Sequence, residues 1–406
     1  MSKTPIFTNL KHNWGNEIES LAIVHIDMDA FFAAIEEKQH PESFGLPIIV
    51  GGTNLSGTIK GVVSSANYLA RKSGVHAGQP MVEAKRYCPQ AKVYPVNMNL
   101  YEEVSQKALT IYNNFTPLVE AYSIDEVFLD LNGSKWLFGS VIDTVKKIRQ
   151  QIANDLGLTC SAGIAPNKLI AKLAAAQAKP NGQIYVCADA VESFIQALPV
   201  GSIWGIGPAT VNKLKTYGIS TVKQLAQLDY TKLKSVFKEK IGLKIWQSAR
   251  GIDYSKVEPY HEPKSIGNQE TLYNETYDET KILEHLLKMV EKSVARLCQA
   301  EYKTRRITLY IRYSGFLDNS TSLTVPDALC DTQSIYSVAK SLYYSIYNGK
   351  KVRLIGISFS KLITNKDDLE QSKFDIFEYG VAKKQRLQTA INRLNNRYGK
   401  QVVHYM

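Results

Sequence analysis

The chain has 406 residues, of which 44% are hydrophobic, and a formal net charge of +11. Its length suits about two to four domains, and its charge favours a polyanionic partner, nucleic acid before membrane. The five cysteines are odd in number, scattered and without a CxxC pair, which argues against a disulfide framework or a zinc site. No apolar run reaches the roughly 18 residues of a membrane span, and the N-terminus lacks a signal pattern, so we expect a cytoplasmic protein.

The first informative element is an apolar stretch that ends in two acids. Residues 21–26 are mostly apolar and rich in β-branched side chains, which predicts a buried strand, and Asp27 and Asp29 stand at its end. Residues 30–38 then have helical spacing and begin with Phe31 and Phe32. The two acids cap this helix, or they belong to a metal site if further carboxylates converge on them.

A second helix, predicted over residues 67–72, carries Tyr68 and Arg71 on one face, with Ser65 just before it. A hydroxyl and a guanidinium on one face suit a phosphate group, because the guanidinium offers forked donors that match phosphate oxygens. The alternative is an amphipathic surface helix that carries both residues incidentally.

Further acids follow in the apolar stretch of residues 119–131, which contains the adjacent pair Asp125 and Glu126. Acids inside a buried strand are costly unless a cation or hydrogen bonds compensate them, whereas a hairpin turn at Ser123 would leave them exposed. Three carboxylates from two strands would suit Mg²⁺, and two such ions support nucleotidyl transfer. A later helix over residues 167–178 has Lys179 at its end. There the ammonium group interacts favourably with the helix dipole or contacts a phosphate.

Five motifs in this order carry a family resemblance: "HIDMDAFFAAIEE", "SANYLARKSGV", "YSIDEVFLDL", "AGIAPNKLIAKLAAAQAKPNG" and "KSIG". Together they span roughly residues 21–363 and resemble the Y-family translesion DNA polymerases of the DinB/UmuC type. The resemblance implies a multidomain fold of α/β and α+β parts, a right-handed polymerase. Its expected parts are the palm (21–30 and 98–186), fingers (31–97), helix-hairpin-helix thumb (187–253), linker (254–263), little finger (264–363) and C-terminal tail (364–406).

The resemblance also implies roles for residues of the motifs. Asp27, Asp125 and Glu126 are similar to the catalytic carboxylates that hold two Mg²⁺ ions, and Met28 would add its backbone carbonyl. Phe32 resembles the steric gate that packs beneath the sugar and excludes a 2′-hydroxyl. The other expected contacts of the incoming nucleotide are Phe31, Ser65, Tyr68, Arg71 and Lys179. Asp29 has no direct metal role in the family pattern, so we expect it to be structural.

The implied reaction is template-directed addition of dNTPs to a primer 3′-end, specialised for error-prone synthesis across damaged template bases, without proofreading. Primer-template DNA and dNTP are the implied substrates of a monomer, and a sliding clamp, a UmuD-type accessory protein and a recombinase filament are possible partners. Two other classes remain open: another palm-type enzyme such as a nucleotide cyclase, and a non-catalytic DNA-binding or clamp-associated protein with a degenerate palm. The presence of all three acids argues against the degenerate palm.

Two regions beyond the predicted palm suggest contacts with the DNA backbone. Gly205 and Gly207 form a turn between two short predicted helices, and the backbone amides of such a hairpin can bind phosphate; the alternative is a plain glycine turn. In the distal module, residues 305–314 and 351–362 alternate with period two, and residues 281–302 have helical spacing. Its basic strand residues contact DNA or form a solvated face: Arg305, Arg306, Arg312 and Arg353.

The tail contains a segment that loosely resembles the clamp-binding peptide of polymerases. Its glutamine and hydrophobic anchors are Gln371, Phe374, Ile376 and Phe377. Such a peptide docks into a preformed hydrophobic pocket, although packing onto the little finger is a rival interpretation. The basic helix predicted after it is more like the UmuC-type enzymes of Gram-positive bacteria than like DinB proteins.

Overall fold

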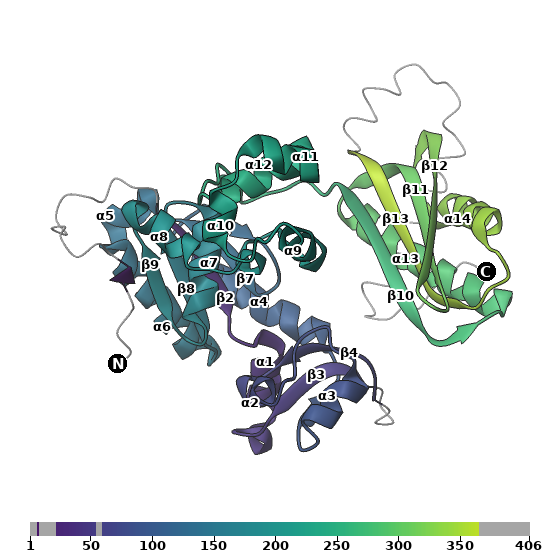
Figure 1. Cartoon of the computed structure of the whole chain (residues 1–406). Coiled ribbons are helices and arrows are strands. Elements are labelled where there is room, and N and C mark those ends of the chain that lie inside the picture. Colours follow the sequence, from purple (N-terminus) through teal and green to yellow (C-terminus); the bar gives the residue numbers. More distant parts are fainter. Residues whose placement is uncertain (1–5, 8–21, 54–58, 365–406) are drawn as a thin grey trace. The chain divides into compact units, whose positions relative to one another are not determined.

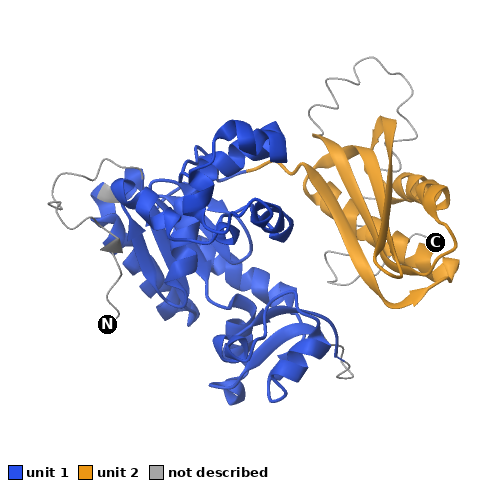
Figure 2. Ribbon diagram, viewed as in Figure 1, with its two compact units in different colours: residues 1–260 blue, residues 261–406 orange. Residues whose placement is uncertain are grey.

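The computed structural model describes residues 6–7, 22–53 and 59–364 (Figure 1). They divide into two compact units, residues 1–260 and residues 261–406 (Figure 2). Among the described residues, no helix is both long and apolar enough to cross a membrane.

A six-stranded sheet forms the centre of the first unit, in the order β1-β9-β8-β2-β7-β6. Its strands are β1 (Ile6–Phe7), β2 (Ile23–Met28), β6 (Val119–Ala121), β7 (Glu126–Asp130), β8 (Cys160–Ala165) and β9 (Gln183–Val186). Every residue of β2 is buried, and this strand runs antiparallel to both of its neighbours, β7 and β8. The apolar stretch that the sequence predicts as a buried strand is therefore the middle of the sheet.

Helices cover both faces of this sheet. Val24 and Ile26 belong to one core with residues of α4 (Met98–Asn113) and α6 (Val141–Leu156). Ile23 belongs to another core with α7 (Lys168–Ala178), because successive strand side chains point to opposite faces. At Gly163 of β8 an added Cβ would lie 2.0 Å from the Ala171 carbonyl oxygen, so α7 packs directly on the strand backbone.

A smaller sheet with the order β4-β3-β5 has a core of its own. Its strands are β3 (Ile48–Thr53), β4 (Ile59–Ala66) and β5 (Lys92–Tyr94), and its helices are α1 (Phe31–Gln39), α2 (Tyr68–Lys72) and α3 (Met81–Tyr87), with the 3₁₀ turn η1 (Pro41–Ser43). Helix α1 begins three residues after β2 and also contacts β3 and β4. It therefore connects the smaller sheet to the end of the central strand.

Short helices make up the rest of the first unit. They are η2 (Asn132–Ser134), α5 (Lys135–Phe138), η3 (Ala188–Ala190), α8 (Val191–Gln196), η4 (Val200–Ser202), α9 (Pro208–Lys215), α10 (Val222–Ala226), α11 (Tyr230–Phe237) and α12 (Glu239–Ser248). The glycine turn lies between η4 and α9, so its first helix is a single 3₁₀ turn and not the α-helix expected of a hairpin. Gly205 has φ +91°, a conformation that side chains other than glycine rarely adopt.

The second unit is an antiparallel sheet with two helices. The strand order is β10-β13-β11-β12, with β10 (Ser265–Thr276), β11 (Tyr302–Tyr313), β12 (Leu317–Leu329) and β13 (Val352–Thr364). Its core includes buried residues of α13 (Glu279–Gln299) and α14 (Thr332–Ile346). Strand β11 alternates almost regularly between buried and more exposed residues, so the helices cover one face of the sheet.

Candidate active site

The strand register brings the predicted acids together. Asp27 pairs directly with Glu126 across β2 and β7, and the Met28 amide donates to the Asp125 carbonyl at 3.0 Å. Residues directly opposite on antiparallel strands have neighbouring side chains. Carboxylates almost a hundred residues apart in the sequence therefore meet where β2 ends and β7 begins.

The interpretation that Asp125 and Glu126 lie inside a strand is wrong. Glu126 is the first residue of β7, and Asp125 lies in the turn that connects it to β6. The Ser123 hydroxyl donates to Asp125 Oδ1 at 2.6 Å, and the Ser123 amide donates to the Glu126 carbonyl at 3.2 Å. The hairpin turn that Ser123 permits is present, but it leaves Asp125 and Glu126 half-buried beside Asp27 and not exposed as that alternative expected.

Lysines from α7 and its C-terminal end contact two of these acids. Lys179 Nζ lies 2.6 Å from Asp27 Oδ2, and Lys172 Nζ lies 2.5 Å from Glu126 Oε2. Burial raises the pKa of Asp27 to about 7, although the Lys179 ammonium opposes this rise. Burial would also raise the pKa of Glu126, but the His25 ring and the Lys172 ammonium outweigh it and lower this pKa to about 2. Of Asp27 and Glu126, Asp27 is thus the carboxylate whose negative charge depends more on additional positive charge.

A cavity of about 180 Å³ opens beside the acids. The predicted residues that line it are Asp27, Met28, Phe31, Phe32, Ser65, Arg71, Asp125, Glu126 and Lys179. Tyr68 is close by, with the Arg71 guanidinium 5.0 Å from its ring centroid, but its hydroxyl donates to Asp29 Oδ1 at 3.1 Å. In this arrangement the Tyr68 hydroxyl proton is bound to Asp29 and does not point into the cavity, so Tyr68 helps to hold the cavity wall in place.

Asp29 is a buried acceptor, although it lies only two residues after Asp27. Besides Tyr68, its carboxylate accepts from the Thr159 hydroxyl at 2.9 Å, the Ser161 hydroxyl at 2.9 Å and the Asn181 amide at 2.8 Å. The bond to Asn181 fixes the turn just after Lys179. The expectation of a structural role agrees with these contacts.

Tyr101 belongs to the site, although its sequence pattern does not predict this. Its ring stacks on Phe32 with centroids 4.2 Å apart and planes 13° apart. Tyr101 is fully buried in α4, where its spacing with other apolar residues is that of an ordinary core position. Only the tertiary contact with α1 distinguishes it from other core tyrosines.

The donor set fits a hard divalent cation. No three histidine, cysteine, aspartate or glutamate side chains of the described residues already form a metal-binding cluster. However, Asp27, Asp125, Glu126 and Met28 line one cavity, and carboxylate and carbonyl oxygens suit Mg²⁺. The ammonium groups of Lys172 and Lys179 lie against two of the acids, which shows that positive charge is favourable there.

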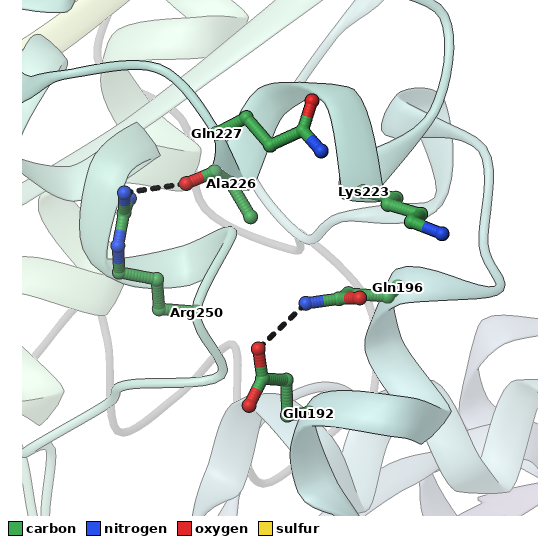
Figure 3. A pocket seen from close by; sticks show the side chains of 6 residues that line it. All are labelled: Glu192, Gln196, Lys223, Ala226, Gln227 and Arg250. Carbon is green, nitrogen blue, oxygen red and sulfur yellow. Dashed lines mark hydrogen bonds between the residues drawn. The ribbon is translucent and has the colours of Figure 1, made fainter.

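A second cavity, of about 530 Å³, lacks converging acids (Figure 3). It is lined by Glu192, Gln196, Lys223, Ala226, Gln227 and Arg250. The Arg250 guanidinium donates to the Ala226 carbonyl at 2.5 Å, and the Gln196 amide donates to Glu192 at 2.8 Å. Because carboxylates converge only on the smaller of these two cavities, the chemistry is assigned there.

Comparisons with known proteins identify the family. Residues 26–176 match the model of the impB/mucB/samB family, residues 263–374 match its C-terminal domain, and residues 201–253 match the thumb domain of DNA polymerase-iota. A DNA polymerase IV of Desulfatibacillum aliphaticivorans is 37% identical over 93% of this chain and 94% of the relative. The chain belongs to the Y-family DNA polymerases.

Other relatives agree with this membership. A DNA polymerase IV of Clostridioides difficile (strain 630) is 36% identical over 88% of this chain and 97% of the relative. A Y-family DNA polymerase chimera has a TM-score of 0.77 at 28% identity, and DinB from Sulfolobus solfataricus has a TM-score of 0.59 at 28% identity. Each structure matches 85% of this chain and 100% of its own. The predicted family and fold class are confirmed.

Membership of the family also establishes the activity. This Y-family polymerase is a DNA-directed DNA polymerase of the translesion type, and its substrates are template-primer DNA and dNTP. The family consists of metal-dependent nucleotidyltransferases without proofreading. The interpretations as a nucleotide cyclase or a degenerate, non-catalytic palm are therefore wrong.

The residues predicted to bind DNA lie in both units of the polymerase. Gly205 is exposed in its turn, and Gly207 is the N-cap of α9. In the second unit, Arg312 forms a forked ion pair with Asp318 at 2.6 and 3.0 Å. Arg353 donates to Glu275 at 3.0 Å, whereas Arg306 is exposed and Arg305 is half-buried on the same sheet. Arg312 and Arg353 would therefore have to exchange a carboxylate for a phosphate on binding DNA.

The predicted clamp-binding residues Gln371, Phe374, Ile376 and Phe377 lie outside the described residues. The likeness of the tail to UmuC-type enzymes concerns the same segment and stays a prediction.

Proposed function

We propose that Asp27, Asp125 and Glu126, with the Met28 carbonyl, hold two Mg²⁺ ions for nucleotidyl transfer. The observation that supports this assignment is the pairing of Asp27 with Glu126 at the edge of one cavity. Bound there, the ions would supply the Lewis acidity that favours attack of the primer 3′-hydroxyl on the α-phosphate and departure of pyrophosphate. The chain itself fixes the carboxylates: the Ser123 turn orients Asp125, and the strand register orients Asp27 and Glu126.

Basic residues of the cavity bind the triphosphate in this proposal. The Arg71 guanidinium lines the cavity while its Nε donates to the Ala66 carbonyl at 2.8 Å, which holds the forked end in place. Lys179 reaches the same cavity from the end of α7 and neutralises charge on phosphate oxygens as it now does on Asp27. Ser65 adds a hydroxyl to the wall, and Tyr68 supports Arg71 through its ring.

The aromatic pair selects the sugar. Phe32 lies at the start of α1 beside the acids and forms the surface beneath the ribose, while Phe31, which is mostly buried, lines the same cavity and contacts the incoming nucleotide. A ring at this place rejects a 2′-hydroxyl by its volume and accepts a 2′-deoxy sugar. The family resemblance supports this role for Phe32.

The finer organisation is part of the same proposal. The palm, fingers, thumb, linker, little finger and tail occupy the ranges given by the sequence, and Gly205, Gly207 and the four arginines contact the DNA backbone. The tail peptide docks into a sliding clamp, and a UmuD-type protein and a recombinase filament are further partners. The enzyme acts as a cytoplasmic monomer on damaged templates.

Primer extension with Mg²⁺ tests the assignment of the acids. Glu126→Gln and Asp125→Asn should each reduce extension about 10³-fold or more while binding of primer-template DNA, measured by fluorescence anisotropy, stays largely intact. Glu103→Gln is a matched control, because Glu103 is an exposed palm acid whose partner is Lys107. Chelation of Mg²⁺ should abolish extension by the wild type. Normal extension by either acid variant would overturn the assignment.

A further inference from the structure

Behind the Phe32 ring lies a buried tyrosine that is fixed by a buried carboxylate. Tyr101 stacks on Phe32, and its hydroxyl donates to Glu36 Oε1 at 2.6 Å. Tyr101 has no exposed surface and Glu36 is 6% exposed, so both are held in close packing. The second carboxylate oxygen of Glu36 lies 3.6 Å from His40 Nε2.

These contacts join helices α1 and α4 through two residues of α1 and one residue of α4. Glu36 and Phe32 are four residues apart on α1, so their side chains lie on the same face of that helix. Tyr101 comes from α4 and contacts both of them. The hydrogen bond to Glu36 therefore fixes how far the Tyr101 ring extends along α1, and with it the surface on which Phe32 rests.

The hydroxyl keeps its proton, because burial and the bond to Glu36 both raise the pKa of Tyr101. Tyr101 is thus the donor and Glu36 the acceptor. If either partner is removed, the other is left buried without this bond, which costs more than the bond itself contributes. The pair consequently has one favourable arrangement, and that arrangement holds the ring parallel to Phe32.

We propose that Glu36 is a positioning residue for sugar selection, which fixes Phe32 by holding the Tyr101 hydroxyl. The inference rests on the proposed role of Phe32 beneath the ribose. A ring excludes a 2′-hydroxyl only if it cannot move back, and the stacked Tyr101 fills the space behind it. Selectivity for deoxynucleotides then depends on a carboxylate that does not touch the nucleotide.

Single-nucleotide insertion tests this role through the ratio of kcat/KM for a dNTP to kcat/KM for the matching rNTP. Glu36→Leu and Tyr101→Phe should each lower this ratio by about fivefold or more, because Phe32 gains freedom to retreat. Glu36→Gln keeps an acceptor oxygen and should stay within about twofold of the wild type. Affinity for primer-template DNA should be unchanged in all three variants, a result that general loss of structure would not give.

Two controls separate the possible outcomes. Phe32→Ala should lower the ratio most; if it leaves the ratio unchanged, the gate assignment fails and this inference fails with it. Tyr313→Phe removes another buried, bonded hydroxyl in the second unit, where Tyr313 donates to the Ile346 carbonyl at 2.8 Å, and should not change the ratio. If Phe32→Ala lowers the ratio but Tyr101→Phe does not, the gate stands and the role of Glu36 is rejected. Tyr101→Phe conserves volume, so this result does not depend on the folding of Glu36→Leu.

Discussion

Asp27 and Asp29 show how environment gives different roles to acids two residues apart. Asp27 is the penultimate residue of β2, beside a cavity, and has a lysine and two other acids as neighbours. Asp29 is 3% exposed and is surrounded by donors from α2, β8 and the adjoining turns. A carboxylate whose oxygens are already occupied by four donors has little capacity for a metal ion. We therefore assign Asp29 a structural role, in which its bond to the Asn181 amide holds the turn just after Lys179.

We predict that Asp29→Ala lowers the free energy of unfolding by about 3 kcal/mol, because it leaves several buried donors without an acceptor. All four tryptophans of the chain lie in residues 1–260, so tryptophan fluorescence in urea reports on this unit. Asp189→Ala, at an exposed position of η3, should change the free energy by less than about 0.5 kcal/mol. Equal effects of the two substitutions would contradict the structural role.

At this scale the sequence predicted most of the residues that line the acidic cavity. Strand-end acids, an aromatic pair and an arginine with a tyrosine are recognisable from spacing, and the cavity contains most of them. Tyr101, Glu36 and Lys172 were not predicted, because an amphipathic helix gives no sign of which core residue meets the site. The hydrogen bond between the Tyr68 hydroxyl and Asp29 was not predictable either, because the two residues are 39 positions apart in the sequence.

Helix α7 positions two of the lysines near the acids, and its distance from the sheet is set by one glycine. A Cβ at Gly163 would lie 2.0 Å from the Ala171 carbonyl oxygen and 2.4 Å from the Ala175 amide nitrogen. Both are backbone atoms of α7, so the helix itself would have to move.

Gly163→Ala should therefore lower the free energy of unfolding by about 1–3 kcal/mol and also reduce the rate of primer extension, because α7 carries Lys172 away from Glu126. Urea unfolding and steady-state extension measure the two effects. Gly133→Ala is the control, since an added Cβ there meets no heavy atom within 4 Å. A stable, fully active Gly163→Ala enzyme would show that the packing of α7 does not set the site.

The segment after α12 is anchored to α7, although its sequence reads as a linker. Lys168 Nζ lies 2.7 Å from both carboxylate oxygens of Glu120, and both side chains are 6% exposed. Glu120 Oε2 also accepts from the Glu258 amide at 2.9 Å, and the Lys168 ammonium donates to the Lys256 carbonyl at 3.3 Å. Lys256 and Glu258, within the predicted linker, are thus bound through their backbone to side chains of α7 and β6.

Lys168→Met should lower the free energy of unfolding by about 3–5 kcal/mol, because it leaves the buried Glu120 without its cation. It should also make residues 254–258 more sensitive to limited proteolysis, followed by mass spectrometry. Lys107→Met breaks the exposed pair with Glu103 and should cost less than about 1 kcal/mol. Unchanged proteolysis in Lys168→Met would mean that the segment is held by other contacts.

Elements whose pattern depends on tertiary contact were the hardest to predict. The segment 254–258 has no periodicity, because backbone groups of Lys256 and Glu258 make its polar contacts with α7 and β6 and Val257 is its one buried side chain. Strand β12 is not apparent from the sequence for a related reason: it is an edge strand with no fully buried residue, so it lacks the alternation that reveals β11. Helix α13 and strands β11 and β13 bury regular faces and were recognised.

Positive charge is unevenly distributed over the whole chain. Residues 199–256 contain ten basic and three acidic residues, against a net charge of +11 for the complete sequence. Lys240 and Lys244 are exposed on α12 one helical turn apart, and both line a cavity of about 440 Å³ with Trp204. A Cβ placed on Gly205 would lie 3.9 Å from the Lys244 ammonium nitrogen. The glycine turn and these lysines therefore form one basic surface, which suits the phosphates of a DNA backbone.

Binding of primer-template DNA at increasing salt tests this distribution of charge. The logarithm of the affinity should fall linearly with the logarithm of the salt concentration, and Lys240→Ala/Lys244→Ala should reduce the slope by about 2, because each lysine releases about one counterion. The loss should be the same for different DNA sequences. Lys107→Ala/Lys146→Ala removes the same charge from exposed positions of α4 and α6. If both double variants reduce the slope equally, affinity follows the total charge of the molecule; a reduction confined to the α12 variant places the phosphate contacts at the thumb.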